Sequence, residues 1–563
     1  NDSAANVRII EGTGNAADNT LAAATTVINS LNQSDFGGTG AATIAMAGQT
    51  LRTHAVLQSI GSGMLTIGAA PNSGTLTTAS PGGSLILNNN ATADLAVNAV
   101  IADNTSSSGL VKLGTGWLLL SANNTYTGPT DVSGGTVELS GSITGSAITI
   151  RANAELDQLS SGLLAGATSL ILNSSGTSTL LGANTHSGGT SLSAGNLFIG
   201  HASALGTGIF TINGGAFSSD ASVTSLASNN AMNGNFTFNG ETPLNLGTGA
   251  VTLGANAQVT VSNAVSSLSV GGDISGAFGI AKTGSGTLVL SGANIHSGGT
   301  TMTGSGTAGT LILGHVSALG TGPVTFNANG SMTVDTSLPD FVNSNNNPIH
   351  FQGNVTFTGS GNMDLGTGPV TILGNRTVTI SANTLKMSGI GGAFNFTKAG
   401  DGQLNLSGVN TYTGTSTFNG AGAVTISGTG SLGAGNYNAS IANNSGFVFA
   451  SSASQTLGGV ISGTGSISKT GSNLMVLSGA NTYSGSTTVT AGTLRIENAS
   501  ALGSGTDALD GTTISAGATL DLGGVSNGSN SATGSERITV SGAGVGGNGA
   551  IVSSGVIASP FIG

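Results

Sequence analysis

The chain has 563 residues, of which 6% are charged, 96 are glycine and none is cysteine. Since a typical soluble domain is about 25% charged, this surface must consist largely of neutral Ser, Thr, Asn and Gly. The 22 acidic residues outnumber the 11 Lys and Arg residues, which disfavours nucleic acid as a partner because its binding depends on basic side chains. The lack of cysteine excludes disulfides and thiol chemistry, and no stretch approaches the roughly 18 apolar residues of a membrane span.

Residues 1–109 are predicted to form the N-terminal coils of an all-β solenoid, and part of this segment is a candidate cap. Short runs such as 65–67 alternate apolar and polar residues, and the alternation returns at 259–261, 378–380 and 404–406. A period of two places Leu, Ile and Val on one face of a strand. Gly, Asn and Ser bracket these runs and supply tight turns, so the pattern indicates many short strands.

One sequence pattern recurs five times, and we number its copies 1 to 5 (residues 110–130, 178–190, 280–300, 396–416 and 467–487). In four copies a lysine stands 12 residues before an asparagine, whereas Leu172 takes the lysine position of copy 2. Two residues after the asparagine comes a tyrosine, which His186 and His296 replace in copies 2 and 3. The repeat residues to which we assign a structural role are Lys112, Asn124, Tyr126, Asn184, Lys282, Asn294, Lys398, Asn410, Tyr412, Lys469, Asn481 and Tyr483.

A longer repeat of some 110 to 120 residues spans the middle of the chain and contains several short, strand-like units. The segment HASALGTG at 201–208 returns as HVSALGTG at 315–322, 114 residues later. Each coil, of roughly 20 residues, would expose an apolar face that the next coil covers. Within one continuous solenoid we therefore expect a first repeat module at 110–177, two long super-repeats at 178–409, C-terminal repeats at 410–523, and a tail, cap or polymerisation segment at 524–563.

Residues 282–301 and 469–494 resemble the autotransporter-associated β-strand repeats, in which a Lys, a Gly-rich turn, paired Leu residues, an S-G-x-N segment and a Gly-Thr pair follow one another in this order. The resemblance implies a right-handed parallel β-helix that is exported to the outer surface of a bacterium with an outer membrane. It says little about biochemical activity, because a fold does not fix a function.

Histidines offer one candidate site. A metal site would pair His186 with His201, and His296 with His315, but no further acidic or histidine ligand stands at a recognisable spacing. The alternative is structural, with an aromatic ring that caps a turn and with histidine as a substitute for tyrosine. The sequence favours the structural interpretation, and we expect no cofactor.

Carboxylates offer a second candidate site. Glu155 with Asp157, and Asp507 with Asp510, lie close enough in sequence to suggest calcium, yet neither the nonapeptide signature nor an EF-hand loop is present. Other acids are scattered singly, whereas a polysaccharide-active β-helix needs a cluster for general acid–base work. We therefore expect solvated acids and no enzyme activity.

Two further patterns have a structural alternative. The lysines of copies 1, 3, 4 and 5 would form one exposed ladder that meets an acidic partner, or they would bond turn carbonyls with their stems on apolar surface; we favour the second. The matches to G-x-S-x-G at 524–528 and to G-x-G-x-x-G at 304–309 lack the strand–turn–helix context that these motifs require.

Two main functional hypotheses follow. The first is a secreted structural protein, a rigid extracellular rod that assembles with itself end to end into a filament or coat, because open solenoid ends invite strand addition. The second is a surface adhesin that binds glycans or cells, and a polysaccharide-active enzyme ranks third. The candidate self-assembly residues are Val7, Ile9, Ile10, Val556, Ile557, Phe561 and Ile562.

Overall fold

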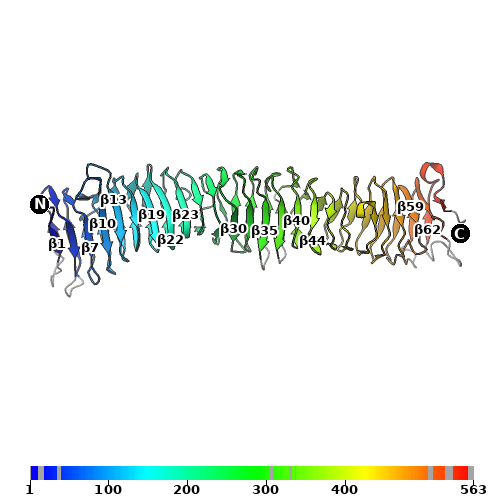
Figure 1. Cartoon of the computed structure of the whole chain (residues 1–563), viewed down its shortest axis with the longest axis horizontal. Coiled ribbons are helices and arrows are strands. Elements are labelled where there is room, and N and C mark those ends of the chain that lie inside the picture. The colour runs from blue at the N-terminus through cyan, green and yellow to red at the C-terminus, as the bar shows by residue number, and fades with distance from the viewer. Residues whose placement is uncertain are drawn as a thin grey trace. The chain divides into compact units, whose positions relative to one another are not determined.

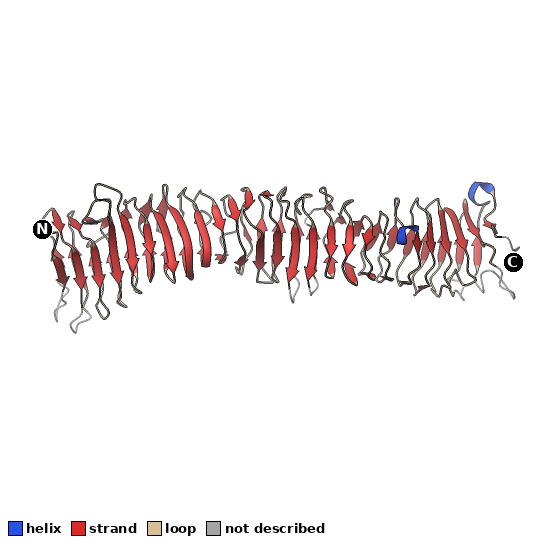
Figure 2. Ribbon diagram, in the orientation of Figure 1, coloured by secondary structure: helices blue, strands red, loops and turns tan. Residues whose placement is uncertain are grey.

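Alternating apolar and polar residues fold into short parallel strands, as the sequence predicts. The computed structural model describes residues 2–9, 18–34, 40–304, 309–328, 332–336, 338–504, 511–525 and 537–555. These residues form two units, Asn1–Phe278 (unit 1) and Gly279–Gly563 (unit 2), and each is an all-β solenoid. Figure 2 shows that strands joined by turns make up almost all of both units.

Unit 1 is built from coils with up to three strands, and the equivalent strands of successive coils pair in parallel (Figure 1). The first series comprises β1 (Asn6–Ile9), β4 (Ser30–Gln33), β7 (Ala55–Gln58), β10 (Ser84–Asn89), β13 (Gly109–Leu113), β16 (Thr130–Val132), β19 (Ala147–Ala152), β22 (Ser169–Leu180), β23 (Thr190–Ile199), β24 (Phe210–Ile212), β26 (Asn230–Met232), β29 (Val251–Leu253) and β32 (Ile274–Ser275).

The second series of unit 1 comprises β2 (Asp18–Thr20), β5 (Ala42–Ala45), β8 (Leu65–Ile67), β11 (Leu95–Val97), β14 (Leu118–Leu120), β17 (Thr136–Leu139), β20 (Glu155–Gln158), the later halves of β22 and β23, β25 (Ala216–Ser219), β27 (Phe236–Phe238) and β30 (Ala257–Val261). The third side carries β3 (Thr25–Val27), β6 (Thr50–Arg52), β9 (Thr75–Thr77), β12 (Val100–Ile101), β15 (Asn123–Asn124), β18 (Ser142–Thr144), β21 (Leu163–Ala165), β28 (Leu244–Asn245) and β31 (Ser267–Val270).

The core of unit 1 is a stack of inward-facing apolar side chains. Leu65 pairs with Leu95, which pairs with Leu118 in the next coil, and none of the three is exposed to solvent. A fully buried side chain of this size contributes about 1.5–3 kcal/mol to stability. Because each coil covers the apolar face of its neighbour, the repeated sequence produces one continuous interior within the unit.

Unit 2 repeats this arrangement with four strand series. The first comprises β33 (Ile280–Thr283), β35 (Thr300–Gly304), β37 (Val324–Ala328), β40 (Ile349–Phe351), β43 (Val370–Ile372) and β46 (Ile390–Gly391). The second comprises β34 (Thr287–Leu290), β36 (Thr310–Leu313), β38 (Met332–Thr336), β41 (Val355–Phe357), β44 (Arg376–Ile380), β47 (Phe396–Ala399), β49 (Ser416–Phe418), β52 (Ile441–Asn443) and β55 (Ile461–Ser462).

The third series of unit 2 comprises β39 (Asp340–Val342), β42 (Asn362–Asp364), β45 (Thr384–Met387), β48 (Gln403–Leu406), β50 (Val424–Ile426), β53 (Phe447–Phe449), β56 (Ile467–Lys469), β58 (Thr487–Val489), β60 (Thr512–Ile514) and β62 (Ile538–Val540). The fourth comprises β51 (Asn436–Tyr437), β54 (Gln455–Leu457), β57 (Leu474–Leu477), β59 (Gly492–Ile496), β61 (Ala518–Asp521) and β63 (Ile551–Val552). Two short 3-10 helices, η1 (Gly433–Gly435) and η2 (Val545–Gly547), complete the described elements.

The coils differ in length along each unit, as the spacing between paired residues of successive strands shows. Leu110 pairs with Thr130, 20 residues later, whereas Asn6 pairs with Ser30 and Thr487 with Thr512. Among the residues that the structure describes, no helix has the length and apolar character that a membrane crossing requires.

Candidate functional site

The repeated lysines lie inside the solenoid, at the corner between two strands. The side chain of Lys112 points inward, and its amine lies in the turn after β13. There Nζ donates to the carbonyl oxygens of Leu113 (2.9 Å), Gly114 (2.9 Å) and Gly134 (3.1 Å). The residue is fully buried, and burial lowers the pKa of its amine to about 8. Three carbonyl acceptors match the three N–H donors of an ammonium group, so the lysine satisfies backbone groups at a tight corner.

The other three lysines repeat this chemistry. Lys282 donates to the carbonyls of Thr283 and Gly284, Lys398 to those of Gly400, Asn419 and Gly422, and Lys469 to those of Gly471 and Ala491. Burial lowers the pKa of Lys282 and of Lys469 to about 8, and it also lowers the pKa of Lys398, which the charge of Asp401 partly restores.

The lysines of unit 2 do not stack on one another. Lys282 lies on β33, Lys398 on β47 and Lys469 on β56, and these strands belong to three different series. All four repeated lysines are buried. Their amines therefore form neither an exposed surface nor a single ladder, and the geometry is that of the turn-carbonyl interpretation.

The repeated asparagines link neighbouring coils. The side-chain oxygen of Asn124 accepts from the backbone N–H of Ile101 at 3.0 Å, while Nδ2 donates to the carbonyls of Ala122 and Ser142. Each of the other copies keeps at least part of this arrangement: Asn184 accepts from Leu164, Asn294 donates to Ala318, Asn410 accepts from Ile390 and Asn481 accepts from Ile461. One amide thus bonds the coils on both of its sides.

The ring that follows the asparagine is buried in every copy. In copy 1 the phenol oxygen of Tyr126 bonds the hydroxyl of Thr130 (2.7 Å), which bonds the hydroxyl of Ser146 (2.8 Å). Tyr412 bonds Ser416 in the same way, and Tyr483 bonds Thr487. Burial raises the pKa of Tyr126 to about 12, so the phenol keeps its proton and acts as a hydrogen-bonding group.

His186 and His296 occupy the same position with a different balance of partners. Each imidazole Nε2 lies 3.0 Å from a threonine hydroxyl, that of Thr190 or Thr300, and the Nδ1 of His296 has no hydrogen-bond partner among the described residues. Burial lowers the pKa of His296 to about 4 and lowers that of His186. The two rings pack against glycines with positive φ, Gly206 and Gly320, where an added Cβ would come within 2.7 Å of ring atoms.

Copy 2 also differs at the lysine position. Leu172 is 2% exposed and lies within β22, a strand of 12 residues that passes the corner with a shift in register. The hydroxyl of Ser174, which is also buried, donates to the carbonyl of Ala154 at 2.5 Å. A serine hydroxyl thus supplies a donor at a corner where copy 1 uses a lysine amine.

The remaining predicted metal ligands serve as turn acceptors. Nδ1 of His201 accepts from the N–H of Ser203 at 3.0 Å, and Nδ1 of His315 accepts from that of Ser317 at 3.1 Å. Glu155 accepts from the N–H of Thr177, whereas Asp507 and Asp510 lie outside the described residues. Within the described ranges, no group of three or more His, Asp or Glu side chains is placed to hold a metal ion.

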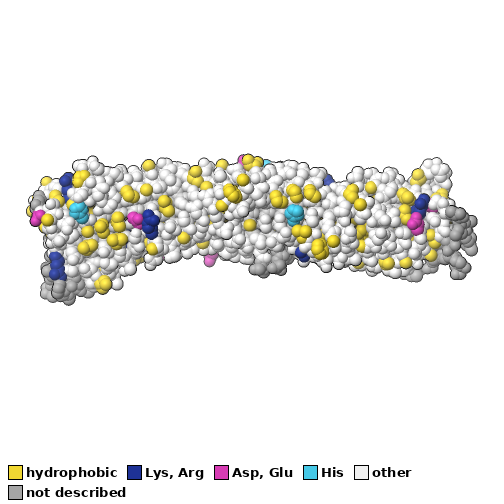
Figure 3. Space-filling model, viewed as in Figure 1, with side chains coloured by type: hydrophobic (Ala, Val, Ile, Leu, Met, Phe, Trp, Pro, Cys, Tyr) yellow, Lys and Arg dark blue, Asp and Glu magenta, His cyan; other side chains and the backbone are white. Residues whose placement is uncertain are grey.

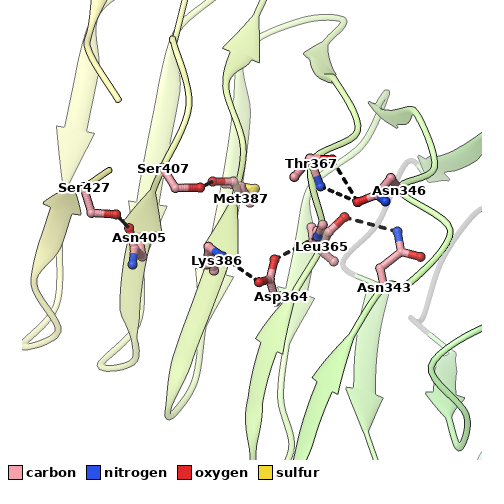
Figure 4. A network of polar contacts seen from close by, with 11 residues as sticks. Asn343, Asn346, Asp364, Leu365, Thr367, Lys386, Met387, Asn405, Ser407 and Ser427 are labelled. Carbon is pink, nitrogen blue, oxygen red and sulfur yellow. Dashed lines mark hydrogen bonds and ion pairs between the residues drawn. The ribbon is translucent and has the colours of Figure 1, made fainter. Parts of the chain in front are cut away.

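Polar side chains of unit 2 bond one coil to the next (Figure 4). Lys386 pairs with Asp364 at 2.8 Å, Asn343 donates to the carbonyl of Leu365 at 3.1 Å, and the hydroxyl of Ser427 donates to Asn405. Asn343 is buried, whereas the contacts of the partly exposed Lys386 and Asn405 occupy side chains that would otherwise be free to bind a ligand. Their role is to hold the coils in register.

Trp117 is the exception to this pattern of internally bonded residues. It is the sole tryptophan of the chain and is 41% exposed. It directly precedes β14, in the row that Met64 and Asp94 occupy before β8 and β11 in the two preceding coils. The sequence places Trp117 inside the repeat pattern, and only the structure shows that its indole faces solvent.

The surface is otherwise nearly uncharged. Figure 3 shows one face on which a few charged and hydrophobic side chains are scattered among side chains of other kinds. A shallow depression of about 470 Å³ in unit 1 has Gly188 and Gly189 in its lining, beside Ile171 and Ile209, with serine and threonine hydroxyls around them. No ionisable side chain lines this depression.

The predicted self-assembly residues are only partly described. Val7 is 38% exposed and lies with Ile9 on β1, which pairs in parallel with β4. The other candidates, Ile10, Val556, Ile557, Phe561 and Ile562, lie outside the described residues. Near the other end of the chain, β62 pairs with β60 and β63 pairs with β61.

Comparisons with known proteins agree with this geometry. The family described as passenger-associated-transport-repeat matches the chain at 110–139, 170–197, 280–307, 396–428 and 467–496. The chain therefore contains the repeats of autotransporter passengers, as its resemblance to that family predicts.

One curated relative adds a specific likeness. Over 346 residues, or 55% of this chain, the sequence is 30% identical to the adhesin BmaC autotransporter of Brucella suis biovar 1 (strain 1330). The match covers 10% of the length of that protein, so this chain corresponds to a small part of it. No solved structure matches the chain.

Proposed function

We propose that this chain is a surface-exposed, non-catalytic passenger solenoid of a bacterium with an outer membrane, with a structural role outside the cell. The observation that carries the proposal is the repeated interior network of Lys, Asn and Tyr or His, which is devoted to backbone carbonyls and to neighbouring coils. Polar residues that could have served chemistry are thus used to close coils. The passenger repeats support export to the cell surface.

Adhesion is the second candidate function, and the curated relative favours it because its name describes an adhesin. The solenoid would display a binding surface at a distance from the cell. Exposed apolar side chains, such as Ile60 and Val265 at 82% each and Ile209 at 53%, provide contact points on a surface that is otherwise polar.

End-to-end assembly is the finer form of the structural proposal. A strand that pairs on one edge presents N–H and C=O groups on the other, which invite a further strand. In the described part of the chain β4 is the strand that pairs with β1, and Val7 on β1 is partly exposed. A heterologous contact of this kind that does not close produces a filament.

Electron microscopy of the purified chain at neutral pH tests the structural proposal, with and without residues 1–10 and 549–563. Filaments that disappear on truncation are expected if the ends join copies. Single particles of equal length in all samples would overturn self-assembly. Binding of the labelled chain to cells and to a glycan array, in the same samples, would then support adhesion instead.

A further inference from the structure

An exposed tryptophan lies among carboxylates on the outer face of unit 1. Four successive strands, β11, β14, β17 and β20, pair in register on this face, so that Leu119 lies opposite Glu138, and Glu138 opposite Asp157. Asp94 stands opposite Trp117 in the preceding coil, whereas in the following coil Thr136 stands opposite Trp117 and Glu138 lies two residues farther along the strand. Coils are about 4.8 Å apart, so the backbone of Asp94 lies one coil spacing from that of Trp117. The backbone of Glu138 lies one coil and two residues away, roughly 8 Å from that of Trp117.

Within the described ranges, these carboxylates have no basic partner. The ion pairs found among the described residues involve Asp131, Asp364 and Asp521 instead. Burial raises the pKa of Glu138, and the charges of Asp157 and Asp94 raise it further. Asp157 acts on Glu138 from the next coil, and Asp94 acts on it from across the tryptophan coil. The local field is negative and uncompensated, which favours a cation.

The indole is not required by the repeat. The position of Trp117, five residues after Lys112, is held by Thr287 after Lys282 and by Gln403 after Lys398. A small or polar side chain thus fits the same corner in copies 3 and 4. A large aromatic side chain that the fold does not need, and that is 41% exposed, is suited to contact with a partner.

We propose that Trp117, together with Asp94, Glu138 and Asp157, forms a docking surface for a positively charged segment of a partner protein. A lysine or arginine side chain of the partner would rest on the indole face, the best cation–π acceptor among side chains. Carboxylates on both sides would pair with that charge or its neighbours. The proposal deepens the adhesin function proposed above and rests on it.

The sole tryptophan makes the site its own reporter. The full chain is titrated with a blocked octa-lysine peptide while tryptophan emission is recorded, and a Gly-Ser peptide of equal length serves as the neutral control. A saturable change in emission is expected with octa-lysine alone. Raising the salt from about 50 to 500 mM should weaken binding at least about threefold, because exposed charges are screened.

Three variants locate the site. Glu138→Gln and Trp117→Thr should each weaken octa-lysine binding about threefold to tenfold. Because Trp117→Thr removes the fluorophore, binding to that variant is measured by calorimetry. Glu241→Gln removes the same charge at an exposed place elsewhere in unit 1 and should change affinity less than about 1.5-fold. Circular dichroism of each variant checks that the solenoid is intact.

Equal losses in Glu138→Gln and Glu241→Gln would overturn the proposal, since the chain would then bind cations only through its net charge of −11. Full affinity in Trp117→Thr would overturn it as well. Salt-independent binding of a neutral oligosaccharide would overturn the proposal and indicate a glycan as the partner instead of a basic protein segment. The peptide assay is independent of cells, so failed cell adhesion with retained octa-lysine binding would reject the adhesin function and keep the cation site.

Discussion

Copies 1 and 2 of the repeat close successive parts of the same unit with different interior chemistry. In copy 1, Lys112 and Tyr126 supply an amine and a phenol, and β13 ends at the corner before β14 begins. At the lysine position of copy 2 stands Leu172, Ser174 provides the donor at the corner, and β22 runs on through it. His186 replaces the tyrosine.

The comparison shows that the solenoid requires a donor at the corner and a ring beneath the turn, while the identity of each can vary. Backbone carbonyls that leave water need partners, since an unpaired buried polar group costs about 1–3 kcal/mol. A lysine amine meets that need at a wide turn, and a serine hydroxyl meets it where the strand continues. Substitutions that exchange residues between copies 1 and 2 therefore test which donor each corner accepts.

The largest effect is expected for Leu172→Lys. The new amine would be buried in a corner whose space Ser174 already occupies, and an unpaired buried charge costs about 3–5 kcal/mol of unfolding free energy. Urea unfolding followed by circular dichroism measures the loss. The double variant Leu172→Lys/Ser174→Gly, which restores the lysine and glycine of copy 1, should recover part of it. A loss below about 1 kcal/mol in the single variant would show that the corner accepts either residue.

Acid should weaken the histidine copies and spare the tyrosine copies. The folded-state pKa of His296 is about 4, below the unfolded value of about 6.5, so the unfolded chain binds the proton more tightly. The stability contributed by neutral His296 is complete above pH 6.5 and is lost as the pH falls through that value toward 4, up to about 3 kcal/mol.

The variant His296→Tyr isolates this effect from the titration of carboxylates. Tyr483 already fits beneath the equivalent turn at Gly503, so the tyrosine should be accommodated. We expect the unfolding free energy of the variant to depend less on pH between 7 and 4.5 than that of the unaltered chain. Parallel curves for the two proteins would assign the acid sensitivity to other groups.

A smaller loss is expected when the lysine of copy 1 is replaced by the leucine of copy 2. Lys112→Leu leaves the carbonyls of Gly114 and Gly134 without the donor that they have now, and Gly114 has a φ of 76° that disfavours the serine used in copy 2. The cost should be about 2–3 kcal/mol by urea unfolding. Hydrogen exchange should localise it to the amides of residues 109–139, and protection lost evenly along unit 1 would contradict a local role.

The smallest effect is expected for Tyr126→Phe. The ring stays, and only the hydroxyl link to Thr130 and Ser146 is lost. Because Thr130 and Ser146 still bond each other, the cost should be about 1 kcal/mol. Tyr483→Phe in copy 5 is the matched variant, with the same expected loss. A loss above about 3 kcal/mol in either would mean that the phenol oxygen holds more than this pair of hydroxyls.

Much of the fold could be predicted because its signals are local and repeated. The alternation at 65–67, 259–261, 378–380 and 404–406 became strands with buried alternate residues. The site was harder to predict. The exposure of Trp117 depends on the direction in which its side chain points at the corner between two strands. The charges of Asp94 and Asp157 both raise the pKa of Glu138 only because the coils stack in register.

The sequence by itself determined the architecture of this protein: short strands, coils of about 20 residues and five copies of one passenger repeat. Period-two alternation and turn residues specify these features without reference to distant residues. Only the tertiary structure decided where each copy falls on the solenoid. Longer coils, such as that between Thr300 and Val324, shift the phase of the repeat, so Lys282, Lys398 and Lys469 lie in different strand series. The lysines point inward because turn carbonyls, once removed from water by stacked coils, must be given donors.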